Sequence, residues 1–139
     1  MRVRKLLLIV PLLLAFPLQA QELRVAELGE CALESGAVLA PCDVYYRTYG
    51  ELNANRDNAI LISTWFGGNS AAWTGILGGG LIDLEGFYTI VVDAFGNGVS
   101  TSPTNSPTQG GDAFPLVSIG DMVQAQHRLV TEVQGLDGL

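Results

Sequence analysis

The fold is decided by the stretch Ala59-Ile60-Leu61-Ile62-Ser63-Thr64-Trp65-Phe66-Gly67-Gly68-Asn69-Ser70. Its first residues are apolar and rich in β-formers, and they lead directly into two aromatic residues and a Gly-Gly turn. This composition predicts a strand that is buried on both faces, as in the parallel sheets of α/β proteins. Because open α/β sheets build their sites at the carboxyl ends of strands, the turn predicts the place of a functional site.

The segments on either side of this strand predict an α/β domain. Residues 21–35 and 38–49 predict two earlier strand regions, the second of which alternates between two faces as an antiparallel strand does. Residues 87–93 predict a further apolar strand. The glycine-rich segments 65–85 and 94–115 predict long loops, and loops of that length are usually functional.

Residues 118–133 predict a clear helix. Ser118 and Asp121 have the spacing of a capping box, with Asp in place of the usual Glu, and Gly135 is placed to end the helix. The apolar positions are expected to form one stripe: Ile119, Met122, Val123, Leu129, Val130 and Val133. Because an apolar strand followed by a helix predicts another parallel strand, we expect a next strand beyond residue 139, without which this stripe and the sheet edge would be under-covered.

The N-terminus predicts a secretion signal over residues 1–20. Three basic residues precede an apolar segment over residues 6–16, which is too short to span a bilayer. Ala20 offers a small residue for cleavage, and an uncleaved N-terminal anchor is the alternative. The mature domain, residues 21–139, is therefore expected to be periplasmic or secreted, without a stable membrane span.

Charge and cysteine content narrow the range of partners. The mature chain has four basic and 14 acidic residues, a net charge of −10, which argues against nucleic acid and anionic membranes. In an exported protein, the isolated pair Cys31 and Cys42 predicts a disulfide rather than a metal site. A turn at Gly36-Ala37 would place the two cysteines opposite each other on a hairpin, and two free buried thiols are the alternative. We expect neither a metal nor a cofactor.

Several motifs resemble one enzyme family, in the same order. Tyr46-Arg47-Thr48-Tyr49-Gly50-Glu51-Leu52-Asn53 is similar to the Y-x-T-Y-G-x-L-N stretch near the start of homoserine O-acetyltransferase-like α/β-hydrolases. Three later segments of this chain also resemble that family: Ser102-Pro103-Thr104-Asn105, Asp112-Ala113-Phe114-Pro115 and residues 119–126. The resemblance covers most of the mature chain. It implies the N-terminal part of an α/β-hydrolase fold, in which an antiparallel hairpin leads into a parallel sheet.

The catalytic triad that the resemblance implies is incomplete in this sequence. The family uses Ser, Asp and His in that chain order, with the serine on a nucleophile elbow between a strand and a helix. No G-x-S-x-G occurs, since Gly98-Val99-Ser100-Thr101-Ser102 lacks the second glycine. His127 lies on the predicted helix, well before the position of the family's base. We therefore expect an N-terminal fragment, or a truncated gene product, that is inactive alone.

The resemblance also implies the oxyanion-binding half of an active site, in the loop that follows the predicted strand over residues 59–64. Matched to the family's H-A-L-T-G segment, Phe66 stands where a backbone N–H stabilises the oxyanion. Thr64 and Gly67 depart from the family's His and Thr, and a plain tight turn is the alternative for the two glycines. We expect Asp93 to shape the pocket wall. The residues expected to line the pocket are Trp65, Gly67, Gly68 and Asn97.

The expected function is that of an exported serine-dependent α/β-hydrolase, which cleaves an ester or other small acyl substrate through an acyl-enzyme. A homoserine O-acetyltransferase-type enzyme is the first alternative. Homoserine acetylation uses cytoplasmic acetyl-coenzyme A, so the predicted secretion signal favours the hydrolase. A non-catalytic exported binding protein with the same fold is the second alternative. Neither glycine cluster, residues 78–80 or 96–98, matches a nucleotide-binding loop.

Overall fold

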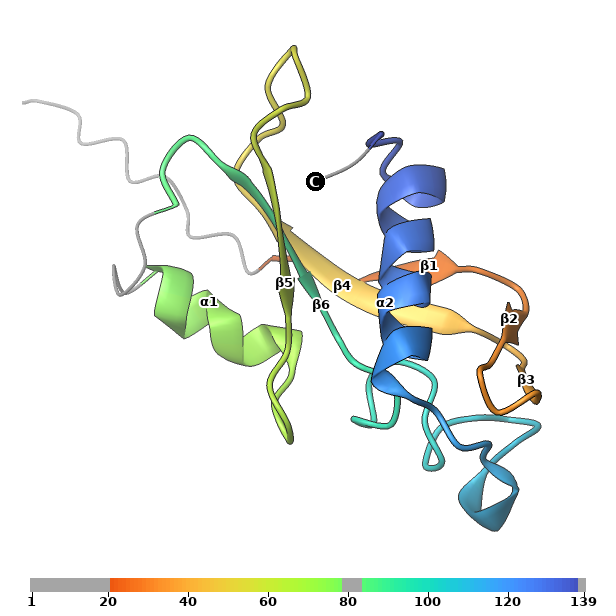
Figure 1. The fold of residues 1–139 in the computed structure, drawn as a ribbon. Helices are drawn as coiled ribbons and strands as arrows, with labels where there is room; N and C mark the ends of the chain where they lie inside the picture. Colours follow the sequence, from red (N-terminus) through yellow and green to blue (C-terminus); the bar gives the residue numbers. More distant parts are fainter. Residues whose placement is uncertain (1–20, 79–83, 138–139) are drawn as a thin grey trace, which may run out of the picture.

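A four-stranded mixed sheet forms the centre of the structure, a computed structural model that describes residues 21–78 and 84–137 (Figure 1). The predicted secretion signal lies outside the described residues. The strands, in their order across the sheet, are β1 (Arg24–Glu27), β4 (Asp43–Tyr49), β6 (Tyr88–Val92) and β5 (Ala59–Ser63). The first three pair antiparallel, whereas β5 and β6 pair parallel. This confirms the expected step from an antiparallel hairpin to a parallel sheet.

Burial along the strands follows their place in the sheet. In β4, Val44, Tyr46 and Thr48 are buried and alternate with half-buried residues, as predicted for a strand with two different faces. The central strand β6 is buried from residue 89 to residue 92. The prediction that β5 is buried on both faces was wrong, because its first four residues are only half-buried. Within the described residues, β5 is an edge strand of the sheet.

Two helices lie on opposite sides of this sheet (Figure 1). The remaining elements are α1 (Ser70–Gly78), α2 (Ile119–Arg128), a π-helical extension of α2 (Leu129–Val133), a 3₁₀ turn (Gly111–Ala113) and the short hairpin strands β2 (Cys31–Ala32) and β3 (Val38–Leu39). Helix α1 corrects the prediction of a loop over residues 65–85. Its first N–H, that of Ser70, donates to the Asp93 carboxylate at 2.8 Å, and the Tyr49 hydroxyl lies 3.0 Å from the Thr74 hydroxyl. These distant contacts stabilise a segment whose glycines disfavour a helix locally.

The predicted helix over residues 118–133 is confirmed, together with its capping box at Ser118 and Asp121. Its apolar side chains, however, do not form one buried stripe. Leu129 and Val130 are buried against the sheet, whereas Ile119, Val123 and Val133 are exposed. The helix therefore packs on the sheet along one flank and leaves a second apolar flank uncovered within the described residues.

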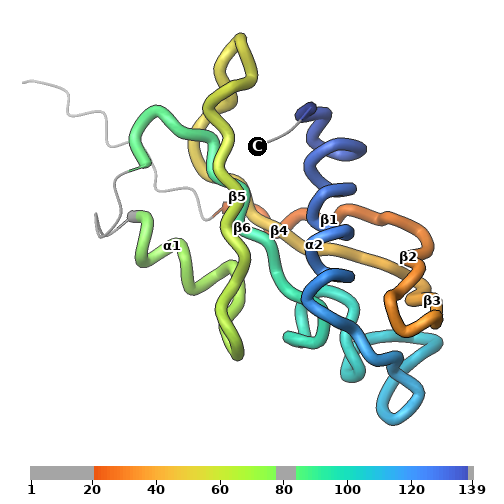
Figure 2. Tube along the Cα trace, viewed as in Figure 1, coloured from red at the N-terminus to blue at the C-terminus, as the bar shows by residue number. Residues whose placement is uncertain are grey.

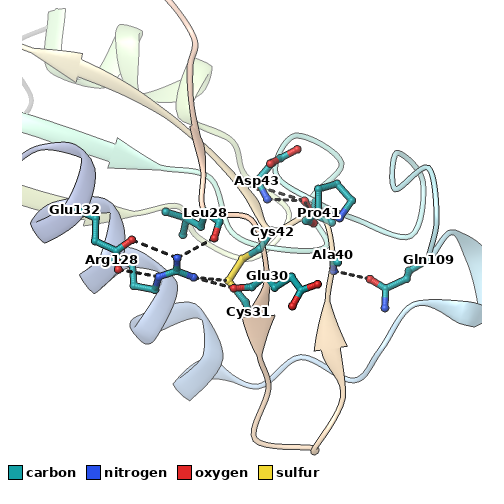
Figure 3. Close-up of a disulfide and its surroundings, with 11 residues drawn as sticks. Leu28, Glu30, Cys31, Ala40, Pro41, Cys42, Asp43, Gln109, Arg128 and Glu132 are labelled. Carbon is teal, nitrogen blue, oxygen red and sulfur yellow. Dashed lines mark hydrogen bonds and ion pairs between the residues drawn. A yellow bond between two sulfur atoms is a disulfide. The ribbon is translucent and has the colours of Figure 1, made fainter.

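The two cysteines form the predicted disulfide, with Cα atoms 5.7 Å apart (Figure 3). The pairing differs from the expected one, because Cys31 faces Leu39 in the β2–β3 ladder. Cys42 instead accepts a backbone hydrogen bond from Leu28, on the segment that precedes β2. Arg128 of α2 reaches the same corner, where its guanidinium donates to the carbonyl oxygens of Leu28 and Glu30. The disulfide thus lies where the hairpin and α2 meet.

Replacing both cysteines by serine should destabilise the fold by about 3 kcal/mol in the chain-entropy model, given a loop with a sequence separation of 11. Urea unfolding of the oxidised wild type and the Cys31→Ser/Cys42→Ser variant would measure the difference. Reducing agent should lower the midpoint of the wild type and leave that of the variant unchanged. Equal midpoints of the oxidised wild type and the variant would contradict the expectation.

Asp121 makes the stability of α2 dependent on pH. Its carboxylate accepts hydrogen bonds from the backbone N–H groups of Ser118 and Glu34, each at 2.8 Å. These bonds lower the pKa of Asp121, and the bond from Ser118 has the larger effect. A carboxyl whose pKa is lowered by folding contributes stability above its unfolded pKa, and this contribution is lost as the pH falls through the folded pKa. The stability difference between wild type and Asp121→Asn should therefore be largest near neutral pH and shrink below about pH 4.

Unfolding free energies measured from pH 7 to pH 3 would check this expectation. Asp112→Asn is the matched control, because Asp112 is exposed in the 3₁₀ turn. A difference between wild type and Asp121→Asn that stays constant over this range would show that the carboxylate charge does not stabilise the helix.

Candidate functional site

A cavity of about 620 Å³ lies at the carboxyl ends of β5 and β6. The two strands end in register, with Ser63 opposite Val92, and the Thr64 N–H donates to the Val92 carbonyl at 3.1 Å. The chain segments after both strands therefore leave the sheet at one edge, where α2 also begins (Figure 2). The cavity is lined by residues 63–67, residues 94–97, and Ile119, Met122, Val123 and Gln126 of α2.

The loop after β5 begins with a tight turn over residues 65–68. The Gly68 N–H donates to the Trp65 carbonyl at 2.9 Å, and Gly67 has a φ of +74°. This is the pattern of a type II turn, which requires a positive φ at its third residue and so favours glycine there. The expected tight turn is therefore present, and it places Phe66 at the second position.

The turn presents two backbone donors beside the cavity. Phe66 and Gly67 both border it, and in the described part of the chain neither N–H group donates a hydrogen bond. The Phe66 side chain is fully exposed, so the turn is held through its backbone and its neighbours. Free N–H groups at the edge of a cavity are the kind of donor that stabilises a developing oxyanion.

Of the residues expected to line the pocket, Trp65, Gly67 and Asn97 border the cavity together with Phe66, whereas Gly68 does not. Gly68 is buried, and a Cβ atom added to it would lie 2.5 Å from Cε2 of the Trp65 indole. The Trp65 ring in turn packs at 5.6 Å, between ring centroids, from Trp73 of α1. Gly68 therefore allows the indole to fold back over the turn. Gly68 itself was expected in the pocket lining, and the structure instead places it against this indole.

Asp93 does not line this cavity itself, but it lies directly before residues 94–97, which do. It is buried, and its Oδ1 accepts hydrogen bonds from the Ser70 N–H at 2.8 Å and from Asn97 Nδ2 at 3.0 Å. Asn97 Nδ2 also lies 3.3 Å from the Gly68 carbonyl. Asp93 thus lies beneath the loop that carries Phe66. The sequence signal that could have indicated this burial is an acidic residue at the end of an otherwise apolar strand.

Two polar residues of the cavity were not predicted. Ser63 Oγ donates to Oε1 of Gln126 at 3.0 Å, which joins the end of β5 to α2. Gln126 is buried although its side chain is polar, and both residues border the cavity. Ser100 and His127, by contrast, do not border it. Ser100 is fully buried with its Oγ donating to the Asp93 carbonyl, and His127 is exposed on α2.

The described ranges, 21–78 and 84–137, contain neither a metal-binding cluster nor a helix that could span a membrane. There, no group of three His, Cys, Asp or Glu side chains could hold a metal ion. No helix in these ranges is both long and apolar enough to cross a membrane.

Comparison with known proteins gives relatives of two activities. No family model matches the chain. It is 40% identical over 115 residues to an ethyl acetate hydrolase of Pseudomonas veronii, covering 81% of this chain and 33% of the relative. It is 37% identical over 120 residues to a homoserine O-acetyltransferase of Citrifermentans bemidjiense, covering 73% of this chain and 33% of the relative.

The structure of the acetyl esterase MekB is similar to this one, with a TM-score of 0.78 and 36% identity over 85% of this chain and 35% of that protein. The chain thus spans about a third of the length of the relatives it matches. The resemblance that the motifs indicated is confirmed by sequence and by fold. The chain has the fold of the N-terminal part of an α/β-hydrolase domain, and its relatives are homoserine O-acetyltransferases and esterases of that superfamily.

Proposed function

We propose that the protein is an exported serine-dependent α/β-hydrolase of small carboxylic esters, and that this chain supplies the oxyanion-binding half of its active site. The observation that carries the proposal is the free N–H of Phe66 beside a cavity of about 620 Å³. Both features lie at the carboxyl ends of parallel strands, where α/β folds place their sites. Relatives that are esterases support a small ester as substrate.

In the proposed reaction, a serine on a segment after Leu139 attacks the ester carbonyl carbon, while a histidine base takes the proton of its hydroxyl. The carbonyl oxygen becomes an oxyanion that accepts a hydrogen bond from the Phe66 N–H. The bond to the alcohol oxygen then breaks, and the histidine returns the proton to the departing alcohol. Water hydrolyses the resulting acyl-enzyme, which releases the carboxylic acid and restores the serine.

The sheet edge next to Phe66 fits this arrangement. Within the described residues β5 has a neighbour on one side only, and Ile119 and Val123 of α2 are 78% and 58% exposed. Both of these side chains border the cavity that begins at the end of β5. A further parallel strand beside β5, followed by a helix against α2, would bury this surface and deliver a serine next to the turn.

Homoserine O-acetyl transfer is the second candidate function. The relatives with that activity reach 37% identity, close to the value for the ester hydrolases. Thr64 and Gly67, however, stand where the transferase family has other residues, and the predicted secretion signal would take the protein away from cytoplasmic acetyl-coenzyme A. These two features favour hydrolysis.

The proposal can be tested on the complete protein encoded by the reading frame that contains this chain. A fluorophosphonate should label one serine after Leu139, and p-nitrophenyl acetate should be hydrolysed without coenzyme A. Acetylation of homoserine that requires acetyl-coenzyme A, with slow ester hydrolysis, would support the transferase instead. Failure to label any serine would favour a non-catalytic binding protein. Recovery from the periplasm or medium with a mature N-terminus near Gln21 would support export.

A further inference from the structure

Asp93 is a buried carboxylate that the reaction itself does not use. Its side chain is 1% exposed at the end of β6, and its Oδ1 accepts two hydrogen bonds. Its Oδ2 is buried and has no partner among the described residues. Burying a carboxylate costs free energy unless hydrogen bonds compensate, so the donors that reach Asp93 are important for its stability.

Of the two donors that Asp93 binds, Ser70 follows the turn that carries Phe66, and Asn97 lies in the loop after β6 and also bonds to that turn. Ser70, whose N–H donates to Oδ1 at 2.8 Å, lies four residues after Phe66. Asn97 donates to the same oxygen at 3.0 Å and also to the Gly68 carbonyl at 3.3 Å, directly behind the turn. Asp93 and Asn97 together therefore hold the distal side of the turn and the start of α1.

Two other contacts hold the turn at its first side: the Thr64 N–H donates to the Val92 carbonyl, and the Trp65 ring packs against Trp73 of α1. Inside the turn there is one hydrogen bond, from the Gly68 N–H to the Trp65 carbonyl. The Trp65 side chain is about half exposed and that of Phe66 is fully exposed. An oxyanion donor is effective only when its direction is set in advance, and bonds to a buried carboxylate are among the stronger ones available for this purpose.

We propose that Asp93 and Asn97 are positioning residues, which hold the turn over residues 65–68 so that the Phe66 N–H faces the cavity. The inference rests on the proposed function, because it concerns the orientation of the oxyanion donor. Neither side chain needs to contact the substrate through this role. Loss of either one should weaken binding of the transition state more than binding of the ester.

The test uses the complete protein and the variants Asp93→Ala, Asp93→Asn and Asn97→Ala, with the exposed Asp112→Ala as the matched control. Active sites are counted by stoichiometric reaction with a p-nitrophenyl phosphonate, so that unfolded protein does not count as lost activity. Asp93→Ala and Asn97→Ala should lower kcat per active site by roughly 10- to 100-fold with little change in KM. Asp93→Asn keeps an acceptor oxygen and should restore most of kcat.

Amide hydrogen exchange gives a second readout, because residues 64–70 should exchange faster in Asn97→Ala than in wild type. If Asp93→Ala does not fold, Asn97→Ala alone tests the inference, because it removes a single amide at the edge of the cavity and is expected to leave the fold intact. An unchanged kcat per active site in Asn97→Ala, or a rise in KM alone, would overturn the inference while leaving the hydrolase reading intact. A wild type that neither reacts with the phosphonate nor hydrolyses the ester would overturn both.

Discussion

A Phe66→Pro variant of the complete protein should lose about 100- to 1,000-fold in kcat for p-nitrophenyl acetate while keeping its fold. Proline has no backbone N–H, so the substitution removes the proposed oxyanion donor. Phe66 stands at the second position of a type II turn, where proline is favoured. Its N–H makes no hydrogen bond in the described part of the chain, so no structural bond is lost with it.

Phe66→Leu is the control for this variant. It changes the exposed side chain but keeps the N–H, and leucine is the residue expected at this position in the resembling family. Its kcat should stay close to the wild-type value, and both variants should unfold at nearly the wild-type temperature. Equal activities of the proline and leucine variants would exclude the Phe66 N–H as the donor.

Gly50→Ala should destabilise the protein by about 3 kcal/mol, from the strain of a left-handed backbone and from overpacking. Gly50 follows β4 with a φ of +73°, and a Cβ atom added to it would lie 2.2 Å from the Phe87 carbonyl oxygen. That oxygen belongs to the backbone immediately before β6, so it cannot move without shifting the central strand. The positive φ and the close backbone contact thus explain why a glycine follows Tyr49 in this motif.

Gly75→Ala offers an opposite result in the same assay. Gly75 lies inside α1, and a Cβ atom added to it would meet no heavy atom within 4 Å. Alanine in a helix interior should therefore stabilise the protein by about 0.5–1 kcal/mol. Chemical unfolding of both variants would measure the two shifts. A Gly50→Ala variant as stable as wild type would show that the β4–β6 junction is looser than the structure indicates.

The parts of the fold that local patterns determine could be predicted from the sequence. The alternation in β4 and the capping box at Ser118 and Asp121 are short-range signals, and the structure has both. Helix α1 could not be predicted, because its stabilising partners, Asp93 and Tyr49, are distant in sequence. The disulfide was predicted with the wrong register, because Cys31 faces Leu39 and Cys42 pairs with the segment before β2.

The candidate site was predictable to a similar extent. The place of the turn after β5 followed from strand order, because two parallel strands end at one edge of the sheet. The positions of Gly68 and Asp93 depended on side chains that fold over them, the Trp65 indole and the Asn97 amide. Single-residue burial of this kind is set by tertiary packing, so the sequence pattern could not supply it.

The central claim is that this chain supplies the oxyanion donor of a serine hydrolase. The most direct test is a crystal structure of the complete protein whose serine has reacted with a p-nitrophenyl phosphonate, since the phosphonyl oxygen then stands where the oxyanion would be. The account predicts that this oxygen lies about 2.7–3.1 Å from the backbone nitrogen of Phe66. A phosphonyl oxygen that is bound by other donors, with the Phe66 N–H facing away from it, would contradict the claim.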